Sequence, residues 1–209
     1  MNLVIPTIFA RNKKEFKERF EKLISVSKNL QIDFMDGKFV EAKSVSLSEI
    51  PNLKRYKNIF EAHLMTENPK RYLKKLEQKG FKKIIFHIES DENSEKLIKK
   101  IKKLKMSAWI AINPETKIEK IISFLKKVDG VLFMGVHPGK ERQKFILGVY
   151  EKIRELRKMN NKVKIQVDGG VDEKVAEKLF SLEVNYVNSG SYISDAKNPK
   201  EKLRKLLGI

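Results

Sequence analysis

Apolar, β-rich runs alternate with amphipathic helical runs along all 209 residues, and this alternation limits the folds available to the chain. Runs typical of buried strands occur at 3–8, 30–35, 59–64, 83–89, 108–112, 130–136, 163–168 and 186–189. Apolar residues at helical spacing occur at 13–27, 47–56, 69–79, 93–105, 118–127, 145–159, 172–182 and 199–207. Strands that alternate with helices build parallel sheets. The pattern predicts a single-domain (β/α)8 TIM barrel over residues 1–209.

An open, doubly wound sheet is the alternative architecture for this alternation, but no GxGxxG motif follows the first expected strand. The sequence contains no linker and no repeat beyond the strand–helix unit. Asn68 and Asn198 each precede a proline at an expected helix start, where asparagine can cap and proline is tolerated. Barrel active sites lie at the C-terminal ends of the strands, so functional residues are expected there.

Composition excludes several classes of function. The chain has no cysteine, which rules out disulfides, thiolate metal ligands and a cysteine nucleophile. It has no apolar run long enough to span a bilayer, and its first residues lack the pattern of a secretory signal. We therefore expect a cytoplasmic protein without a membrane partner.

The net charge of +18 invites a nucleic-acid interpretation, but the lysines are spread over nearly every expected helix. In the segment 96–105 the apolar residues follow helical spacing and the lysines occupy the other face. Aromatic residues that could stack on bases do not interleave with them. This pattern predicts a solvated surface and no specific nucleic-acid partner. The positive field would still attract anionic phosphate compounds.

Polar side chains gather at the ends of three expected strands. Because residues two apart in a strand share a face, three sets point the same way: Gln31, Asp33 and Met35; Glu61, His63 and Met65; Gln166 and Asp168. Core strands would not bury carboxylates and an imidazole without a purpose. The sequence therefore predicts a catalytic pocket built on Asp33, His63 and Asp168.

Seven short motifs, each at a strand end and all in register, resemble those of the ribulose-phosphate 3-epimerase family. They are Pro6-Thr7-Ile8, the segment from Asp33 to Val40, His63-Leu64-Met65, His87-Ile88-Glu89, Pro138-Gly139, the segment from Val167 to Val171, and Gly190-Ser191. The resemblance covers nearly the whole chain and implies a (β/α)8 enzyme. The superfamily's decarboxylases and aldolases carry an Asp-x-Lys-x-x-Asp segment, whose spacing 33–38 does not supply.

The resemblance implies that Asp33 and Asp168 are the catalytic acid and base. In the family, one carboxylate removes the C3 proton of a pentulose 5-phosphate, and a second acid returns a proton to the opposite face of the enediolate. The expected reaction converts D-ribulose 5-phosphate to D-xylulose 5-phosphate. Two alternatives remain open: an epimerase for another ketose phosphate such as allulose 6-phosphate, and an inactive barrel that binds a sugar phosphate.

The family also uses a divalent metal, which polarises the ketone. Carried over, its ligands would be Asp33, His63, Asp168 and Gln31, where Gln31 replaces a family histidine. An amide oxygen is a weaker donor than imidazole for zinc, so zinc, manganese, iron or magnesium could occupy the site. Alternatively the site holds no metal and Gln31 donates an N–H to the enediolate. His137, which replaces a family asparagine, could compensate as a ligand or serve as a polar wall residue.

The resemblance further implies a substrate pocket and a homo-oligomer. The pocket residues carried over are Thr7, His63, Met35, Met65, Met134, Gly139, Arg142, Gly169, Gly170, Gly190 and Ser191. The glycines and Ser191 would meet the phosphate through backbone N–H groups, and His87 and Glu89 would support neighbouring side chains. In the sixth loop Glu141 and Arg142 replace family glycines, so positive φ angles there would be costly, and Lys140 or Arg142 could bind phosphate by side chain.

Overall fold

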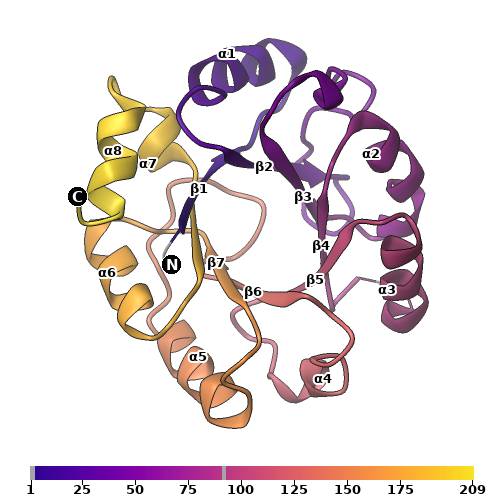
Figure 1. Cartoon of the computed structure of the whole chain (residues 1–209), viewed down its shortest axis with the longest axis vertical. Coiled ribbons are helices and arrows are strands. Elements are labelled where there is room, and N and C mark those ends of the chain that lie inside the picture. Colours follow the sequence, from indigo (N-terminus) through magenta and orange to yellow (C-terminus); the bar gives the residue numbers. More distant parts are fainter. Residues whose placement is uncertain (1–2, 91–92) are drawn as a thin grey trace.

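The computed structural model describes residues 3–90 and 93–209, and its centre is a closed barrel of parallel strands (Figure 1). The strands follow one another around the barrel in chain order, and β8 pairs with β1 to close it. They are β1 (Leu3–Ile8), β2 (Asn29–Met35), β3 (Ile59–Met65), β4 (Lys83–His87), β5 (Ser107–Ile112), β6 (Gly130–Met134), β7 (Ile165–Asp168) and β8 (Tyr186–Ser189). The predicted (β/α)8 fold is confirmed.

Helices lie around the outside of the barrel (Figure 1). They are α1 (Lys13–Leu23), α2 (Leu73–Lys79), α3 (Ser94–Lys103), α4 (Glu119–Ile122), α5 (Gly148–Met159), α6 (Glu173–Ser181), α7 (Ser191–Ser194) and α8 (Pro199–Leu206), with 3₁₀ turns η1 (Leu53–Arg55) and η2 (Pro69–Arg71). Asn12, Asn93, Asp172 and Asn198 cap α1, α3, α6 and α8 with their side-chain oxygens. The predicted Asn198 cap is confirmed, whereas Asn68 makes no such bond to η2 among the described residues.

Two predicted helices are much shorter in the structure. The helix expected over 47–56 is only the turn η1, because Pro51 lies within the segment and Leu47, Ile50 and Leu53 bury their side chains from an irregular backbone. In the segment 118–127, only α4 is helical, and turns follow it. In contrast, the short helix α7 was not expected from the sequence.

Side chains that point outward from the strands form the main apolar core against the helices, while the barrel interior holds a smaller apolar cluster around Trp109, Leu132 and Met134. Gly130 makes room for this cluster, since a Cβ atom there would lie 2.4 Å from the Trp109 ring. The strand register places Asp33 beside His63 and Met134 beside Asp168. The polar strand ends are thereby assembled at one end of the barrel.

The helices of the described ranges are short, and most carry many charged residues. None of them has both the length and the apolar composition needed to cross one.

Candidate active site

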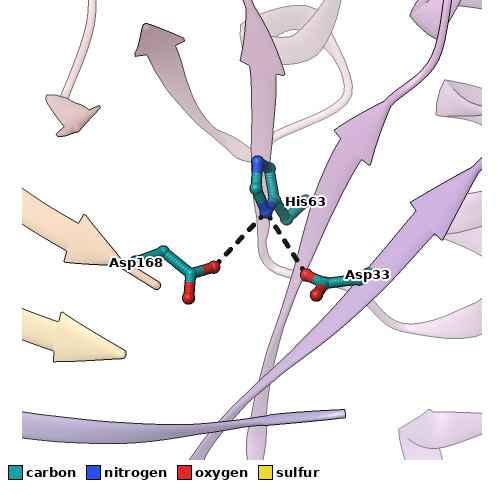
Figure 2. A group of neighbouring side chains, drawn as sticks. All are labelled: Asp33, His63 and Asp168. Carbon is teal, nitrogen blue, oxygen red and sulfur yellow. Dashed lines mark hydrogen bonds and ion pairs between the residues drawn. The ribbon is translucent and has the colours of Figure 1, made fainter. Parts of the chain in front are cut away.

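Three strand ends bring Asp33, His63 and Asp168 into one cluster, as the sequence predicts (Figure 2). His63 Nδ1 lies 3.3 Å from Asp33 Oδ1 and 3.5 Å from Asp168 Oδ2. His63 is fully buried, and each aspartate is only 7% exposed. Strands β8 and β1 separate β7 from β2 around the barrel, so the two carboxylates approach the cluster from different directions. A pair of buried carboxylates on either side of one imidazole can exchange protons with a molecule held between them.

Burial and mutual contact shift the proton affinities of the cluster. Burial raises the pKa of Asp33 to about 6, and the charge of Asp168 adds to this effect. Burial alone would lower the pKa of His63, but hydrogen bonds and charges from Asp168 and Asp33 outweigh it and raise that pKa to about 9. In the absence of a cation, the imidazole therefore holds a proton at neutral pH and offsets part of the negative charge.

A second histidine and a glutamate orient His63 from the side of its ring that is turned away from the carboxylates. His63 Nε2 lies 2.9 Å from His87 Nε2, and His87 Nδ1 lies 3.2 Å from Glu89 Oε2. Burial lowers the pKa of His87, which favours its neutral form. Neutral His87 can donate its Nδ1–H to Glu89 and accept from His63 Nε2–H, which leaves His63 Nδ1 facing the carboxylates. The supporting role predicted for His87 and Glu89 agrees with these contacts, and such support is typical of metal-binding histidines.

Asp33, His63 and Asp168 fit a divalent cation. One ligand atom of each lies within 4.8 Å of the other two, and a set of two carboxylates and one imidazole suits several divalent metals. The candidate ligand atoms also face each other directly, with His63 Nδ1 between the two carboxylates (Figure 2).

Gln31 reaches the same cluster, but with its nitrogen. Gln31 Nε2 lies 2.9 Å from Asp33 Oδ1 and 2.5 Å from Asp168 Oδ2, while its oxygen accepts a hydrogen bond from Asn188 at 2.8 Å. The NH₂ group of a glutamine side chain donates hydrogen bonds and cannot ligate a metal. The expectation that Gln31 supplies an oxygen ligand is therefore not met in this arrangement.

His137 does not complete the cluster. Its side chain is 62% exposed, and its Nδ1 lies 3.3 Å from Glu115 Oε1 at the outer surface. In this arrangement the His137 ring contacts Glu115 and none of the three cluster residues, so compensation for the missing family histidine stays a prediction.

One cavity above the cluster contains every residue predicted to bind substrate. Its lining includes Thr7, Met35, His63, Met65, Met134, Gly139, Arg142, Gly169, Gly170, Gly190 and Ser191, together with Asp33 and Asp168. Phe9, which was not among the predicted pocket residues, also lines this cavity. Phe9 directly follows the motif Pro6-Thr7-Ile8, and its place at this strand end is the one sequence feature that could have predicted it.

The sixth loop differs from a glycine-rich loop as the sequence indicates. Arg142 has a φ of 59°, in the left-handed region that favours glycine, and its guanidinium binds Asp195 at 2.8 Å. Glu141 makes a paired contact with Arg19 of α1, at 2.7 and 3.1 Å. The loop is therefore held by ion pairs to neighbouring elements at the mouth of the cavity.

The sequence matches a family model over most of its length. The model described as the ribulose-phosphate 3-epimerase family aligns with residues 3–194. The chain belongs to the ribulose-phosphate 3-epimerase family. It is accordingly an enzyme of the isomerase class, an epimerase, and its motifs at Asp33, His63 and Asp168 are those that carried the resemblance.

Similar proteins from distant organisms carry the family's name. The ribulose-phosphate 3-epimerase of Aquifex aeolicus is 31% identical over 100% of this chain and 97% of its own length. That of Chlamydia muridarum is 35% identical over 86% of this chain and 82% of its own length. That of Schizosaccharomyces pombe is 27% identical over 95% of this chain and 89% of its own length.

Solved structures support the fold of this epimerase family member. A 3-hexulose-6-phosphate synthase matches with a TM-score of 0.72 at 13% identity, and covers 99% of this chain and 98% of its own. A mutant tryptophan synthase alpha-subunit from Pyrococcus furiosus matches with a TM-score of 0.72 at 16% identity, over 99% and 98% of the two chains. At such identities the likeness concerns the barrel alone.

Proposed function

We propose that this chain interconverts D-ribulose 5-phosphate and D-xylulose 5-phosphate by inverting the configuration at C3. The observation that carries the proposal is the pair of buried carboxylates, Asp33 on β2 and Asp168 on β7, which line one cavity. Inversion of a carbon next to a ketone needs a base on one face and an acid on the other. The names of the relatives from Aquifex aeolicus and Chlamydia muridarum support the choice of sugar.

One carboxylate removes the C3 proton and leaves an enediolate, and the other carboxylic acid returns a proton to the opposite face. The two groups must be in opposite protonation states at the start of each turnover. Asp33, whose pKa burial raises to about 6, suits the acid, so Asp168 acts as the base in one direction. The two roles exchange in the reverse direction.

Asp33, His63 and Asp168 would hold a divalent cation, which supplies Lewis acidity beside the ketone and enediolate oxygens when bound. His87 and Glu89 keep the His63 ring oriented for this purpose. Met35, Met65 and Met134 line the wall of the cavity with apolar, polarizable side chains. Their proposed role is to exclude water from the reacting carbons.

The phosphate group would bind where the seventh and eighth loops meet the sixth. Gly169 and Gly170 have φ angles of 103° and 68°, and a Cβ atom at Gly170 would lie 2.7 Å from the backbone nitrogen of Phe145. These glycines therefore permit a close approach of backbone, which suits N–H contacts to an anion. Arg142 lines the same cavity and adds positive charge.

An epimerase for a longer ketose phosphate, such as allulose 6-phosphate, is the second candidate. The observation that favours it is the charged sixth loop, where Lys140, Glu141 and Arg142 line the cavity. A change of loop chemistry there alters the lining of the same cavity that holds Asp33 and Asp168. We also propose that the chain forms one domain, assembles as a homo-oligomer and acts in the cytoplasm.

Conversion of D-ribulose 5-phosphate by the purified protein tests the proposal, before and after chelation and with zinc, manganese, iron or magnesium restored. We expect turnover that chelation abolishes and one of these metals restores. Turnover that survives chelation would support the reaction but remove the metal from it. Turnover of allulose 6-phosphate alone would favour the second candidate, and turnover of neither sugar would favour an inactive binding barrel.

A further inference from the structure

Beneath the carboxylate cluster, the barrel interior carries a second layer of buried polar side chains that the proposed reaction does not use. Gln31, Gln166 and Asn188 are fully buried, and Glu61 is 4% exposed. The Lys83 side chain is only 11% exposed. Five different strands supply this layer, from β2, β3, β4, β7 and β8. Burying so many polar groups is costly unless each finds a partner.

The layer begins at a buried cation. Lys83 Nζ lies 2.8 Å from Glu61 Oε2, contacts Gln166 Oε1, and stands 3.6 Å from the centre of the Trp109 ring. Burial lowers the pKa of Lys83, but the Glu61 carboxylate opposes this and favours the ammonium form. An ammonium group only donates hydrogen bonds. Gln166 must therefore turn its oxygen towards Lys83 and its nitrogen away.

This constraint passes from one amide to the next. Gln166 Nε2 donates to Glu61 Oε1 at 2.5 Å and to Asn188 Oδ1 at 2.6 Å. Asn188 therefore turns its nitrogen away from Gln166 and donates to Gln31 Oε1 at 2.8 Å. With its oxygen occupied in this way, Gln31 presents its nitrogen to Asp33 and Asp168. Each amide has one donor end and one acceptor end, so the donor-only ammonium of Lys83 and the acceptor-only carboxylate of Glu61 together set the direction.

We propose that Lys83, together with its partner Glu61, positions Gln31 as a hydrogen-bond donor to the two catalytic carboxylates and thereby keeps the Gln31 oxygen out of cation coordination. Lys83 is a positioning residue, because it acts through Gln166 and Asn188 and not by touching the reacting atoms. The cation site then consists of Asp33, His63 and Asp168 alone. The cation itself rests on the proposed function, whereas the direction of the hydrogen bonds does not.

Rotation of the Gln31 amide would be opposed along the whole layer. Its nitrogen would face Asn188 Nδ2, which leaves two donors in contact unless Asn188 and Gln166 rotate as well. A rotated Gln166 would then turn its nitrogen to the Lys83 ammonium, which cannot accept a hydrogen bond. A buried donor without an acceptor is destabilising. The layer therefore favours a single direction.

The double variant Lys83→Gln with Glu61→Gln tests the proposal, with Zn²⁺ binding to the chelator-treated protein measured by titration calorimetry. Two neutral amides can donate or accept, so they no longer set the direction, and the Gln31 oxygen becomes free to turn towards the cation. We expect the Zn²⁺ dissociation constant to fall about tenfold while the thermal midpoint stays within a few degrees of wild type. Merely structural damage would weaken binding, so the sign of the change distinguishes the two.

Two further variants complete the design. Lys83→Arg keeps a donor-only side chain, so its Zn²⁺ affinity should match wild type. Gln31→Leu should leave Zn²⁺ affinity within threefold in the wild-type background but cancel the tenfold gain in the double variant. These single variants test the proposal even if the double variant does not fold.

A folded double variant with unchanged or weaker Zn²⁺ binding would overturn the proposal, as would a tenfold loss on Gln31→Leu alone. Failure of every form to bind Zn²⁺ or Mn²⁺ would overturn it too. None of these readouts depends on sugar turnover. An inactive protein that shows the expected affinities would therefore contradict the proposed reaction and leave the positioning role of Lys83 supported.

Discussion

Asp33 and Asp168 share one cavity and one imidazole, yet their carboxylates come from strands that two other strands separate. This arrangement lets each carboxylate address a different face of a bound carbon. It also places two like charges close together, which is tolerated because His63 and the Gln31 amide contact both. Substitution of these residues therefore tests the chemistry most directly.

Replacing either aspartate by asparagine should remove the acid–base chemistry with little change of shape. We expect Asp33→Asn and Asp168→Asn each to lower kcat by about 10³-fold, within the range typical of a lost general acid or base. Asp172→Asn is the matched control, since Asp172 caps α6, lies close to the site in sequence, and asparagine caps equally well. Steady-state rates with D-ribulose 5-phosphate measure the effect. A loss below tenfold in either catalytic variant would contradict the assigned roles.

The pH dependence of stability should carry the signature of His63 when the protein is free of metal. The pKa of His63 is raised from 6.5 to about 9 in the folded state, so the stabilisation is complete below pH 6.5 and is lost as the pH rises through 9. We expect the free energy of unfolding to fall over this window by on the order of 3 kcal/mol. Urea unfolding of the chelated protein at pH 6, 7.5 and 9 measures it.

His63→Asn provides the comparison for that experiment, because asparagine carries no titrating proton. Its unfolding free energy should change less between pH 6.5 and 9 than that of the wild type. Equal slopes in the two proteins would show that His63 does not hold a proton in the folded cluster.

At the scale of elements, the sixth loop is held to α1 by the two contacts between Arg19 and Glu141. Both side chains are mostly buried, 17% and 16% exposed, so this pair is less screened than an ion pair on the open surface. Glu141 also lines the cavity. Without Arg19, its carboxylate would stand uncompensated at the site proposed for a phosphate.

We expect Arg19→Met to raise KM for the sugar phosphate about tenfold while kcat changes less than threefold. The reason is repulsion between Glu141 and the phosphate, which affects binding and not proton transfer. Lys17→Met is the control on the same helix, where the lysine is 73% exposed and pairs only weakly with Glu21. An equal rise of KM in both variants would instead indicate a general effect of charge.

The elements themselves could largely be predicted, because periodicity of apolar residues is local information. The position of Asp33, His63 and Asp168 in the site could be predicted in two steps. Side chains alternate along a strand, and active sites of (β/α)8 barrels lie at the C-terminal ends of the strands. The helix predicted for 47–56 was wrong, because the buried leucines and isoleucine of this segment have helical spacing but pack from an irregular backbone. Helix α7 was too short to leave a periodic signal.

The direction of the Gln31 amide could not be predicted from the sequence. It depends on Asn188, Gln166 and Lys83, which lie 157, 135 and 52 positions away, so it appears only when the strands are brought together. Residue type alone left both ends of the amide available. The same limit applies to His137, whose contact with Glu115 bridges two loops.

At the scale of the whole molecule, the net charge of +18 should favour the capture of anionic substrates. The lysines lie mainly on the outer helices, as the exposed pattern of α3 illustrates. We expect kcat/KM for a sugar phosphate to fall several-fold between about 0.03 and 0.3 M salt, since the Debye length shortens over this range. A salt-independent kcat/KM would show that the surface charge plays no part in capture.

Inversion of C3 by two carboxylates through an enediolate requires exchange of the C3 proton with solvent, and this exchange can be measured directly. D-Ribulose 5-phosphate is incubated with the enzyme in D₂O, and the position of deuterium in both sugars is followed by NMR spectroscopy. We expect D-xylulose 5-phosphate to form with deuterium at C3. Asp33→Asn and Asp168→Asn should slow its formation by about 10³-fold. Product without deuterium at C3, or deuterium at C1 alone, would contradict the account.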